Sequence, residues 1–298
     1  MDTFLKFYQH IPEQINPEIF HIGFFSVGWY SVMYLVAFFV VFRLLERRLQ
    51  LDEGGSSFEN TFEKKGKDKL EKQKGFILDF MYVCFLGVVI GGRLGYVLFY
   101  NLPFYLAHPL AIISPFDAAT GELIGIYGMS YHGGLIGALL AVLFFVRFRK
   151  LNFWALSDFV VPAIPAGYLF GRIGNFLNGE LYGRATDIWI GMYFPSDALG
   201  VLRHPSQLYE AFLEGFLLFW LFWRIRNKKV VQGKLLGLYL IGYAVARFIG
   251  EFFREPDEQV GLFMSYFTLG QLFSLAMLIG GLVLVFCERR KCAIIKQC

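Results

Sequence analysis

Long apolar segments, separated by short polar ones, run along most of the 298-residue chain. The first of them, residues 19–42, contains no Asp, Glu, Lys or Arg. About 20 such residues are enough to cross the hydrocarbon core of a bilayer as a helix. The same pattern along the rest of the chain predicts seven membrane-spanning helices. They are expected at residues 19–43, 77–100, 132–148, 155–174, 206–223, 235–253 and 268–286.

The composition supports a membrane protein over a water-soluble one. Hydrophobic residues make up 56% of the chain, and 35 residues are phenylalanine. The residues before the first apolar segment lack the basic-then-apolar order of a cleaved signal peptide, so we expect the first span to be retained as an anchor. The predicted fold class is therefore an all-α, polytopic transmembrane protein.

Lys and Arg residues gather in alternate segments between the predicted spans. Most of the 28 follow the first, third, fifth or seventh span, and cytoplasmic loops of membrane proteins are the ones enriched in Lys and Arg. We therefore expect the N-terminus outside and the C-terminus inside. The chain, 1–298, then forms a single integral membrane domain with a cytoplasmic basic loop at 45–75 and a cytoplasmic tail at 287–298. Its net charge of +4 follows from this topology and gives no support for a nucleic-acid partner.

Seven basic residues lie outside these cytoplasmic segments. They are Lys6, Arg93, Arg172, Arg184, Arg203, Arg247 and Arg254. Arg93, Arg172 and Arg247 fall inside or at the ends of spans, all expected toward the outer leaflet. A single arginine there could bond helix-end carbonyls and extend toward the interface. Three at similar depth favour a phosphate site, because planar guanidinium groups bind phosphate oxygens through two parallel hydrogen bonds.

Other polar residues lie near these arginines in the sequence. Tyr243, Arg247 and Glu251 are spaced four apart, which places them on one helical face, and Arg172 and Asn175 can also point the same way.

Two of the five histidines are considered for the site. His132 begins the third span beside two glycines, and His204 precedes the fifth. A histidine at this level could be an interface anchor or a hydrogen-bonding residue at a helix start. Its predicted depth beside the arginines favours His132 as a base.

Four acidic residues fall within apolar segments. Asp79 and Asp158 begin spans on the cytoplasmic side, where they suit helix N-termini. Glu210 could support the arginines or form a structural ion pair, and Glu214 is assigned no role. The four cysteines show no paired metal-ligand spacing. We expect no metal and no cofactor.

An anion transporter is the main alternative, because buried arginines and glycine-rich spans also line anion pathways. No convincing internal repeat is present, and the arginines gather on one side of the predicted membrane. An intramembrane protease is less favoured, since no serine or aspartate pair stands in a catalytic context.

Several motifs resemble those of one family, the bacterial phosphatidylglycerol–prolipoprotein diacylglyceryl transferases. The resemblance rests mainly on GRIGNFLNGELYG, residues 171–183. Further motifs follow in the family's order: WYSVMYLVAF (29–38), LGVVIGGRLGYVLFYN (86–101), MSYHGGLIG (129–137), RHPSQLYEAFLEG (203–215) and LIGYAVARFIGEFFREPD (240–257).

The resemblance implies transfer of a diacylglyceryl group from phosphatidylglycerol to the lipobox cysteine thiol of a prolipoprotein, with release of glycerol 1-phosphate. It places the protein in the bacterial inner membrane, with its active site toward the periplasm. It also implies a periplasmic arm segment at 101–128 and a small periplasmic head segment at 175–205. We expect a monomer whose partners are the lipid and the prolipoprotein signal peptide.

The resemblance also assigns site residues. It implies that His132 is the base and that Arg172 and Arg247 bind the lipid phosphate. The residues implied to shape the site are Tyr30, Asn175, Glu180, Gly183, Tyr243 and Glu251. To these we add Arg93, His204, Glu210 and Arg254 as candidate substrate-binding residues. The chain departs from the family in a long segment at 45–75 and a short one at 184–202, which leaves little head for docking the prolipoprotein.

Overall fold

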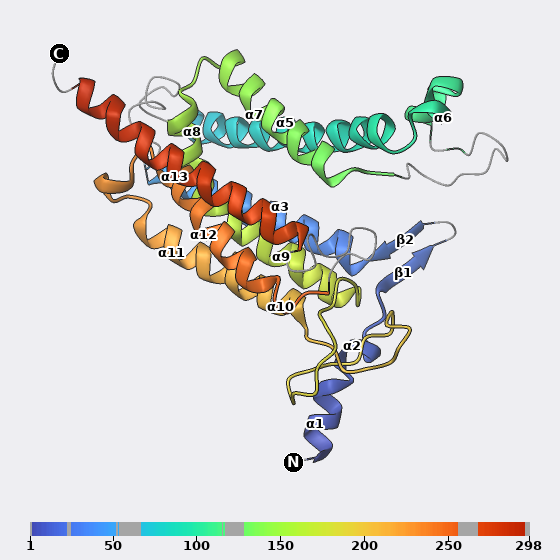
Figure 1. The fold of residues 1–298 in the computed structure, drawn as a ribbon. Coiled ribbons are helices and arrows are strands. Elements are labelled where there is room, and N and C mark those ends of the chain that lie inside the picture. The colour runs from blue at the N-terminus through green and yellow to red at the C-terminus, as the bar shows by residue number, and fades with distance from the viewer. Residues whose placement is uncertain are drawn as a thin grey trace. The chain divides into compact units, whose positions relative to one another are not determined.

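Helices make up most of the computed structural model (Figure 1). The structure describes residues 2–22, 25–51, 53, 67–114, 116, 128–255 and 268–295. Its contacts divide the chain into two compact units, one made of Met1–Glu53 with Ser157–Cys298 and the other of Gly54–Leu156. Each unit is described by itself, and a single integral membrane domain stays a prediction.

The first unit begins with two short helices and a β-hairpin and continues as a helical bundle. Its elements are α1 (Asp2–Gln9), α2 (Ile11–Gln14), β1 (Glu18–Ile22), β2 (Phe25–Gly28), α3 (Trp29–Gln50), α8 (Phe153–Val160, shared with the second unit), η2 (Val161–Ala163), α9 (Ile164–Leu177), α10 (Ser206–Glu210), the π-helical η3 (Ala211–Leu217), α11 (Leu218–Ile225), η4 (Lys229–Val231), α12 (Leu235–Gly250) and α13 (Leu269–Ile295).

The β-hairpin occupies residues that the hydropathy pattern assigns to the first membrane helix. β1 and β2 pair antiparallel, with His21 opposite Ser26. α3 begins only at Trp29, whose amide donates to the Pro17 carbonyl at 3.0 Å. A short apolar run does not distinguish strand from helix, so the prediction of a helix that begins at residue 19 is wrong, while the predicted helical fold holds for most of the described residues.

Within the described part of the chain, four helices are long and apolar enough to cross a membrane, and two shorter ones are apolar. The four are Trp29–Gln50, Leu70–Phe99, Tyr131–Phe148 and Phe153–Leu177; the shorter ones are Leu235–Gly250 and Gly270–Phe286. The predicted 206–223 span is divided among α10, η3 and α11, because a π-helical turn interrupts it. The described residues thus form a mainly helical membrane protein, while seven spans and an N-out orientation stay predictions.

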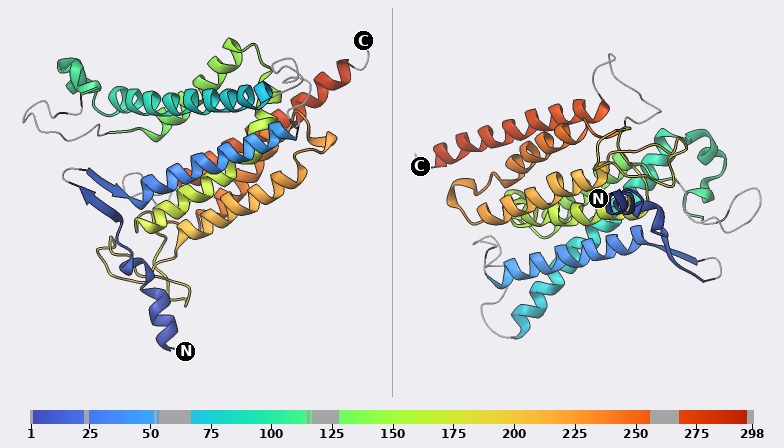
Figure 2. Two further views of the ribbon diagram at one scale, coloured as in Figure 1. Left: turned by 180° about the vertical axis from the view of Figure 1, so that it is seen from behind. Right: turned by 90° about the horizontal axis from the view of Figure 1, so that it is seen from below.

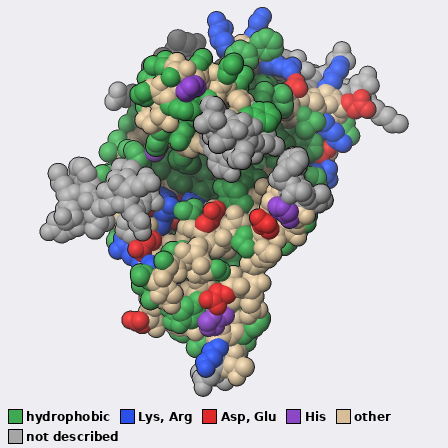
Figure 3. Space-filling model, turned by 90° about the vertical axis from the view of Figure 1, so that its right-hand side faces the viewer, with side chains coloured by type: hydrophobic (Ala, Val, Ile, Leu, Met, Phe, Trp, Pro, Cys, Tyr) green, Lys and Arg blue, Asp and Glu red, His purple; other side chains and the backbone are tan. Residues whose placement is uncertain are grey.

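Large apolar side chains are exposed along these helices. Leu35 is 71% exposed, Phe144 61% and Ile279 56%. Figure 3 shows such side chains, in green, at the surface on one face of the molecule. Exposed apolar surface on this scale is unfavourable in water and suits contact with lipid.

The first unit's bundle brings α9, η3 and α12 together. α3 packs against α9, α9 against η3, and α12 against α13, and Figure 2 shows α3, α9, α11, α12 and α13 running side by side. A buried cluster that includes Leu218, Phe222 and Leu235 lies where α11 meets α12. The charged residues described below lie on these same helices.

The second unit is built on two closely packed helices. Its elements are α5 (Lys67–Phe99), α6 (Leu102–Ala107), η1 (Pro109–Ile112) and α7 (Tyr131–Phe148). α5 and α7 meet through glycines: a Cβ atom added at Gly91 would overlap the Gly133 carbonyl, and one at Gly137 would overlap the Gly87 carbonyl. These positions let the two backbones approach each other directly.

Several predicted loops are partly helical. α3 extends to Gln50 and α5 begins at Lys67, so both ends of the 45–75 segment are helix, and residues 54–66 lie outside the described part. α13 continues through Ile295 into the predicted 287–298 tail. The 101–128 segment contains α6 and η1, with 117–127 outside the described part.

The 175–205 segment is mostly loops after α9, joined by isolated bridges such as Ala185 to Arg203 and Met192 to Arg203.

The two acidic residues assigned to helix starts have different roles. Asp158 accepts from the Leu235 amide at 3.1 Å and thus caps α12, not its own helix. Asp79 lies inside α5 and pairs with Arg149. Near Asp158, Arg48 donates to the carbonyls of Asp158 and Phe159 at 2.8 and 2.6 Å, which ties the end of α3 to α8.

Candidate active site

Arg172, in the GRIGNFLNGELYG motif, is held by neighbours on its own helix. Its Nε donates to the Tyr168 hydroxyl at 2.7 Å, and its Nη1 donates to Asn175 Oδ1 at 3.3 Å. These residues are four and three positions away, so one face of α9 presents all three. The Arg172 guanidinium also lies 5.0 Å from the centre of the Tyr168 ring.

Asn175 connects Arg172 to Glu180. Its Nδ2 donates to Glu180 Oε1 at 2.9 Å. The chain turns back after α9 through Gly179, whose φ of +66° favours glycine, and the Glu180 amide donates to the Asn175 carbonyl at 3.1 Å. The Asn175 side chain therefore links Arg172 and Glu180 through one hydrogen bond to each.

Arg247, on α12, pairs with carboxylates from two helices. Its Nη2 contacts Glu251 Oε1, four residues along the same helix, and its Nη1 donates to Glu210 Oε1 at 3.0 Å. The predicted i, i+4 arrangement of Arg247 and Glu251 is confirmed. Tyr243 lies edge-to-face with Tyr168, with ring centres 5.7 Å apart, and so joins α12 to α9.

Glu210 is the point where three arginines meet. Its Oε2 lies 2.7 Å from Arg172 Nε, and its Oε1 lies 3.0 Å from Arg247 Nη1 and 3.7 Å from Arg254 Nη1. The side chains of the three arginines are 13–14% exposed, whereas that of Glu210 is 1% exposed. Glu210 is therefore the buried ion-pair partner shared by three arginine side chains that are themselves slightly exposed. We call Arg172, Arg247, Arg254, Glu210, Glu214 and Glu251 the arginine–carboxylate cluster.

Two further contacts complete this cluster. Glu214 Oε1 lies 3.8 Å from Arg247 Nη1. Glu251 Oε2 accepts from the Thr268 hydroxyl at 2.7 Å. Thr268 also caps α13, because its Oγ1 accepts from the Gln271 amide while Gln271 Oε1 accepts from the Thr268 amide. The start of α13 is thereby fixed against the cluster.

Tyr30 lies at the start of α3 beside the motif. Its ring and Cα lie within 3.5 Å of the place where a Cβ would extend from Gly174, and its hydroxyl is 2.9 Å from that of Tyr34. Its phenol faces Asn175 and Glu180. Tyr30 therefore adjoins the Asn175 side of the site.

Gly183 joins three segments of the chain. Its amide donates to the His204 carbonyl at 2.8 Å, it bridges to Arg254, and a Cβ at this position would overlap the Phe253 carbonyl. Here the glycine is required for close backbone approach. The contact holds Arg254 near the cluster.

His204 packs among aromatic rings. Its Nδ1 lies 3.2 Å from the Tyr209 hydroxyl, and its ring is edge-to-face with Tyr209 and Phe253. Burial lowers the pKa of this imidazole. A role for His204 in binding substrate stays a prediction.

Arg93 and His132 belong to the second unit. Arg93 is 8% exposed and donates to the carbonyls of Ile112 and Ala111 at 2.7 Å and of Gly128 at 3.3 Å, with its guanidinium 5.1 Å from the Tyr105 ring centre. Arg93 therefore bonds backbone carbonyls, which is the alternative to phosphate binding that the sequence left open. Its predicted contact with substrate stays a prediction.

His132 is the second residue of α7 and is exposed. Ser130 caps this helix by accepting from the Gly133 amide at 3.2 Å. His132 belongs to the second unit, whereas Arg172 and Arg247 belong to the first. Their predicted proximity therefore stays a prediction.

Comparison with known proteins identifies the family. Residues 17–287 match the prolipoprotein diacylglyceryl transferase family. The chain belongs to this family. It is 44% identical over 293 residues to the phosphatidylglycerol–prolipoprotein diacylglyceryl transferase of Chlorobaculum tepidum, covering 97% of this chain and 96% of the relative.

Other relatives that carry the same name show similar sequence identity and coverage. Identity is 43% over 272 residues for that of Vibrio vulnificus, covering 91% of this chain and 90% of the relative. It is 41% over 278 residues for that of Bordetella avium, covering 93% and 96%. The resemblance seen in the motifs is thus confirmed.

Three residues in or beside the arginine–carboxylate cluster are not predicted from the sequence. Tyr168 lies four residues before Arg172, Glu214 lies four residues after Glu210, and Thr268 directly precedes α13. The first two could have been found by extending the helical spacing from residues already chosen. Thr268 carries only the capping signal of Thr followed three residues later by Gln.

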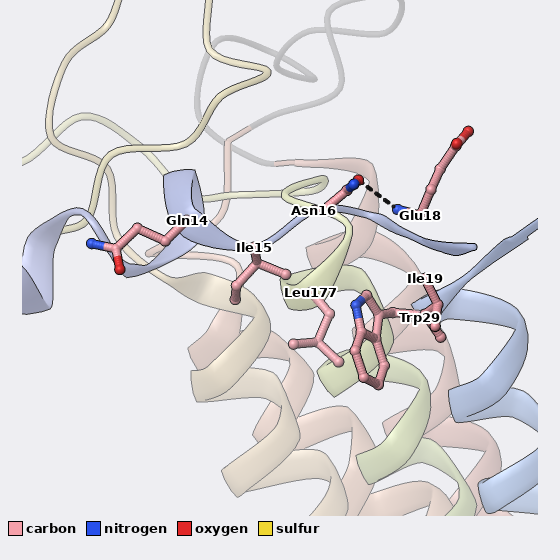
Figure 4. Close-up of a pocket in the computed structure, with 7 residues that line it drawn as sticks. All are labelled: Gln14, Ile15, Asn16, Glu18, Ile19, Trp29 and Leu177. Atoms are coloured by element: carbon pink, nitrogen blue, oxygen red, sulfur yellow. Dashed lines mark hydrogen bonds between the residues drawn. The ribbon is translucent and has the colours of Figure 1, made fainter. Parts of the chain in front are cut away.

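An open pocket of about 460 Å³ lies at the junction of α2, β1, α3 and α9 (Figure 4). Trp29 and Leu177 lie side by side in it, next in sequence to the Tyr30 and Asn175 region. Asn16 Oδ1 accepts from the Glu18 amide at 3.0 Å at its rim. None of the seven lining residues belongs to the arginine–carboxylate cluster.

Proposed function

We propose that the protein transfers the diacylglyceryl group of phosphatidylglycerol to the lipobox cysteine thiol of a prolipoprotein, releasing glycerol 1-phosphate. This is the first step of bacterial lipoprotein maturation. The observation that carries the proposal is the convergence of Arg172, Arg247 and Arg254, whose side chains are partly exposed, on buried Glu210. The family membership supports the same reaction.

Arg172 and Arg247 bind the lipid phosphate. Among the described residues, the contacts of Arg172 use Nε and Nη1 and those of Arg247 use Nη1 and Nη2, so both groups are held in place before a ligand arrives. Fixed donors stabilise charge that develops on a leaving group without reorganisation. Each well-placed donor contributes roughly 3–4 kcal/mol.

The reaction forms one bond and breaks one. The cysteine sulfur attacks the glycerol carbon that bears the phosphate ester, a C–S bond forms, and the C–O bond breaks toward phosphate. Free thiols have a pKa of about 8.5, so deprotonation aids the attack. His132 takes the thiol proton, which requires the sulfur to approach its imidazole to about 3 Å. The phosphomonoester leaves with the electron pair of the C–O bond.

The remaining site residues position these groups. Asn175 and Glu180 orient Arg172, Glu251 orients Arg247, and Tyr243 packs against Tyr168, whose hydroxyl bonds Arg172. The further proposed substrate-binding residues are Tyr30, Arg93, Gly183, His204, Glu210 and Arg254.

The proposed setting is the bacterial inner membrane. Seven spans with the N-terminus outside place 101–128 and 175–205 in the periplasm, as arm and head, and 45–75 and 287–298 in the cytoplasm. The alternation of basic segments supports this topology. The chain acts as a monomeric, single membrane domain on the lipid and the prolipoprotein signal peptide.

The test uses purified protein in nanodiscs containing phosphatidylglycerol, with a lipobox peptide, and measures released glycerol phosphate. We expect His132→Ala to abolish release and Arg247→Ala to lower it more than about tenfold, with Arg247→Lys restoring only part because the planar fork is lost. Arg172→Ala behaves like Arg247→Ala. Arg224, which lies over Trp220 and outside the cluster, gives the matched control Arg224→Ala. No release by the folded parent protein contradicts the proposal, and full release by His132→Ala contradicts the base.

A further inference from the structure

Glu214 is a buried carboxyl group within the arginine–carboxylate cluster that the proposed chemistry does not use. It lies in the π-helical segment η3, and its side chain is 0% exposed. No well-aligned hydrogen bond reaches either of its oxygens among the described residues; the Tyr168 hydroxyl faces the carboxyl group, and the nearest guanidinium nitrogen lies 3.8 Å away. π-helical turns within α-helices often occur at functional sites.

The groups around Glu214 come from every helix packed against it. Arg247 Nη1 on α12 lies 3.8 Å away, and Tyr168 and Arg172 face it from α9. Glu210 lies one turn earlier on its own helix, and Gly250 leaves room for the carboxyl, since a Cβ there would lie 3.5 Å from Oε1. Glu251 and Tyr243 line the same side of α12. An ionised carboxylate without hydrogen bonds is costly in such surroundings.

The charge of the cluster depends on this one group. Arg172, Arg247 and Arg254 supply three positive charges, and Glu210 and Glu251, which are the carboxylates in closest contact with these guanidinium groups, supply two negative ones. With Glu214 neutral, the cluster carries one net positive charge. With Glu214 ionised, it carries none. A phosphodiester headgroup carries a single negative charge, so only the first state complements it.

We propose that Glu214 is held as a neutral carboxylic acid, which leaves the cluster with the one positive charge that selects a singly charged phosphodiester. The inference rests on the proposed function for the identity of the ligand. The proton on Glu214 itself is a property of the ligand-free protein. The two can therefore be tested separately.

The first test is infrared spectroscopy of the ligand-free protein in phosphatidylcholine nanodiscs at neutral pH, in H₂O and D₂O. We expect a protonated-carboxyl C=O band that shifts in D₂O, is absent from Glu214→Gln and persists in Glu210→Gln. Glu214→Asp keeps a carboxyl group and should shift the band without removing it. This variant tests the proposal even if Glu214→Gln does not fold. A parent protein without the band, or a band that Glu214→Gln retains, overturns the proposal.

The second test follows the KM for phosphatidylglycerol as pH rises. Deprotonation of Glu214 cancels the positive charge, so the parent KM should rise toward alkaline pH, and that of Glu214→Gln should be lower there by about threefold or more. Tyr168→Phe must retain the rise, because the Tyr168 phenol is another titratable group that faces Glu214. A flat parent profile, or the same rise in Glu214→Gln, overturns the charge-selection role. If no glycerol phosphate is released at all, the proposed function fails while the infrared band still reports on Glu214.

Discussion

Replacing Glu210 with glutamine removes one negative charge from the point where three guanidinium groups meet. The side chain keeps its size and its ability to accept a hydrogen bond, so the change is mainly electrostatic. Oε2 is 2.7 Å from Arg172, and Oε1 is 3.0 Å from Arg247 and 3.7 Å from Arg254. The glutamine amide also brings N–H donors toward guanidinium groups that are themselves donors only.

The magnitude follows from burial. Removing one partner of a buried ion pair costs about 3–5 kcal/mol, and the 13–14% exposure of the arginines favours the lower end, about 3 kcal/mol. If the loss falls on the arrangement that binds the phosphate, kcat/KM decreases by about 100-fold. If it falls only on folding, the unfolding temperature decreases while kcat/KM of the folded protein is retained.

The assay measures glycerol phosphate release and thermal unfolding for Glu210→Gln beside a matched carboxylate. Glu46 is 4% exposed and bonds Arg43 at 2.6 Å, outside the cluster, so Glu46→Gln should change stability without changing kcat/KM. A value of kcat/KM for Glu210→Gln within about threefold of the parent would refute the view that Glu210 positions the arginines for the reaction.

Two further predictions concern stability. Gly91→Ala forces a methyl group into the Gly133 carbonyl and should cost about 1–3 kcal/mol, seen as a lower unfolding temperature, whereas Gly75→Ala, with no atom within 4 Å, should not lower it. The bidentate hydrogen bonds from Arg203 lower the pKa of Asp197. This stabilisation is complete above the unfolded value of about 3.9 and is lost as pH falls through the lower folded value. Asp197→Asn should therefore unfold at a lower temperature than the parent at pH 7, and this difference in unfolding temperature should become smaller below about pH 4. A difference that does not change with pH would contradict the assignment.

The parts of the site that the sequence predicts are those set by one helix. The pairing of Arg247 with Glu251 and of Arg172 with Asn175 follows from spacings of four and three residues, because helical geometry alone places such side chains together. The apolar helices were predictable for a similar reason, since length and composition decide whether a helix can span a bilayer.

The parts that it does not predict depend on local backbone choices or on distant segments. The hairpin at Glu18–Gly28 is as apolar as a membrane helix, so hydropathy does not separate the two. The segment after α6 turns back, so that the carbonyls of Ala111 and Ile112 accept hydrogen bonds from Arg93. Depth along a span gives no sign of these hydrogen bonds.

The convergence on Glu210 shows why a list of candidate residues does not by itself define a site. Arg172 lies on α9, whereas Arg247 and Arg254 lie on and just after α12, and an arginine on an apolar helix is satisfied equally well by carbonyls, as Arg93 shows. What distinguishes the three is the buried carboxylate of Glu210 that they share, while their own side chains stay 13–14% exposed. Buried ion pairs contribute little net stability. Stability of the fold alone therefore does not explain such a cluster in an apolar bundle, and this supports the proposed anionic ligand.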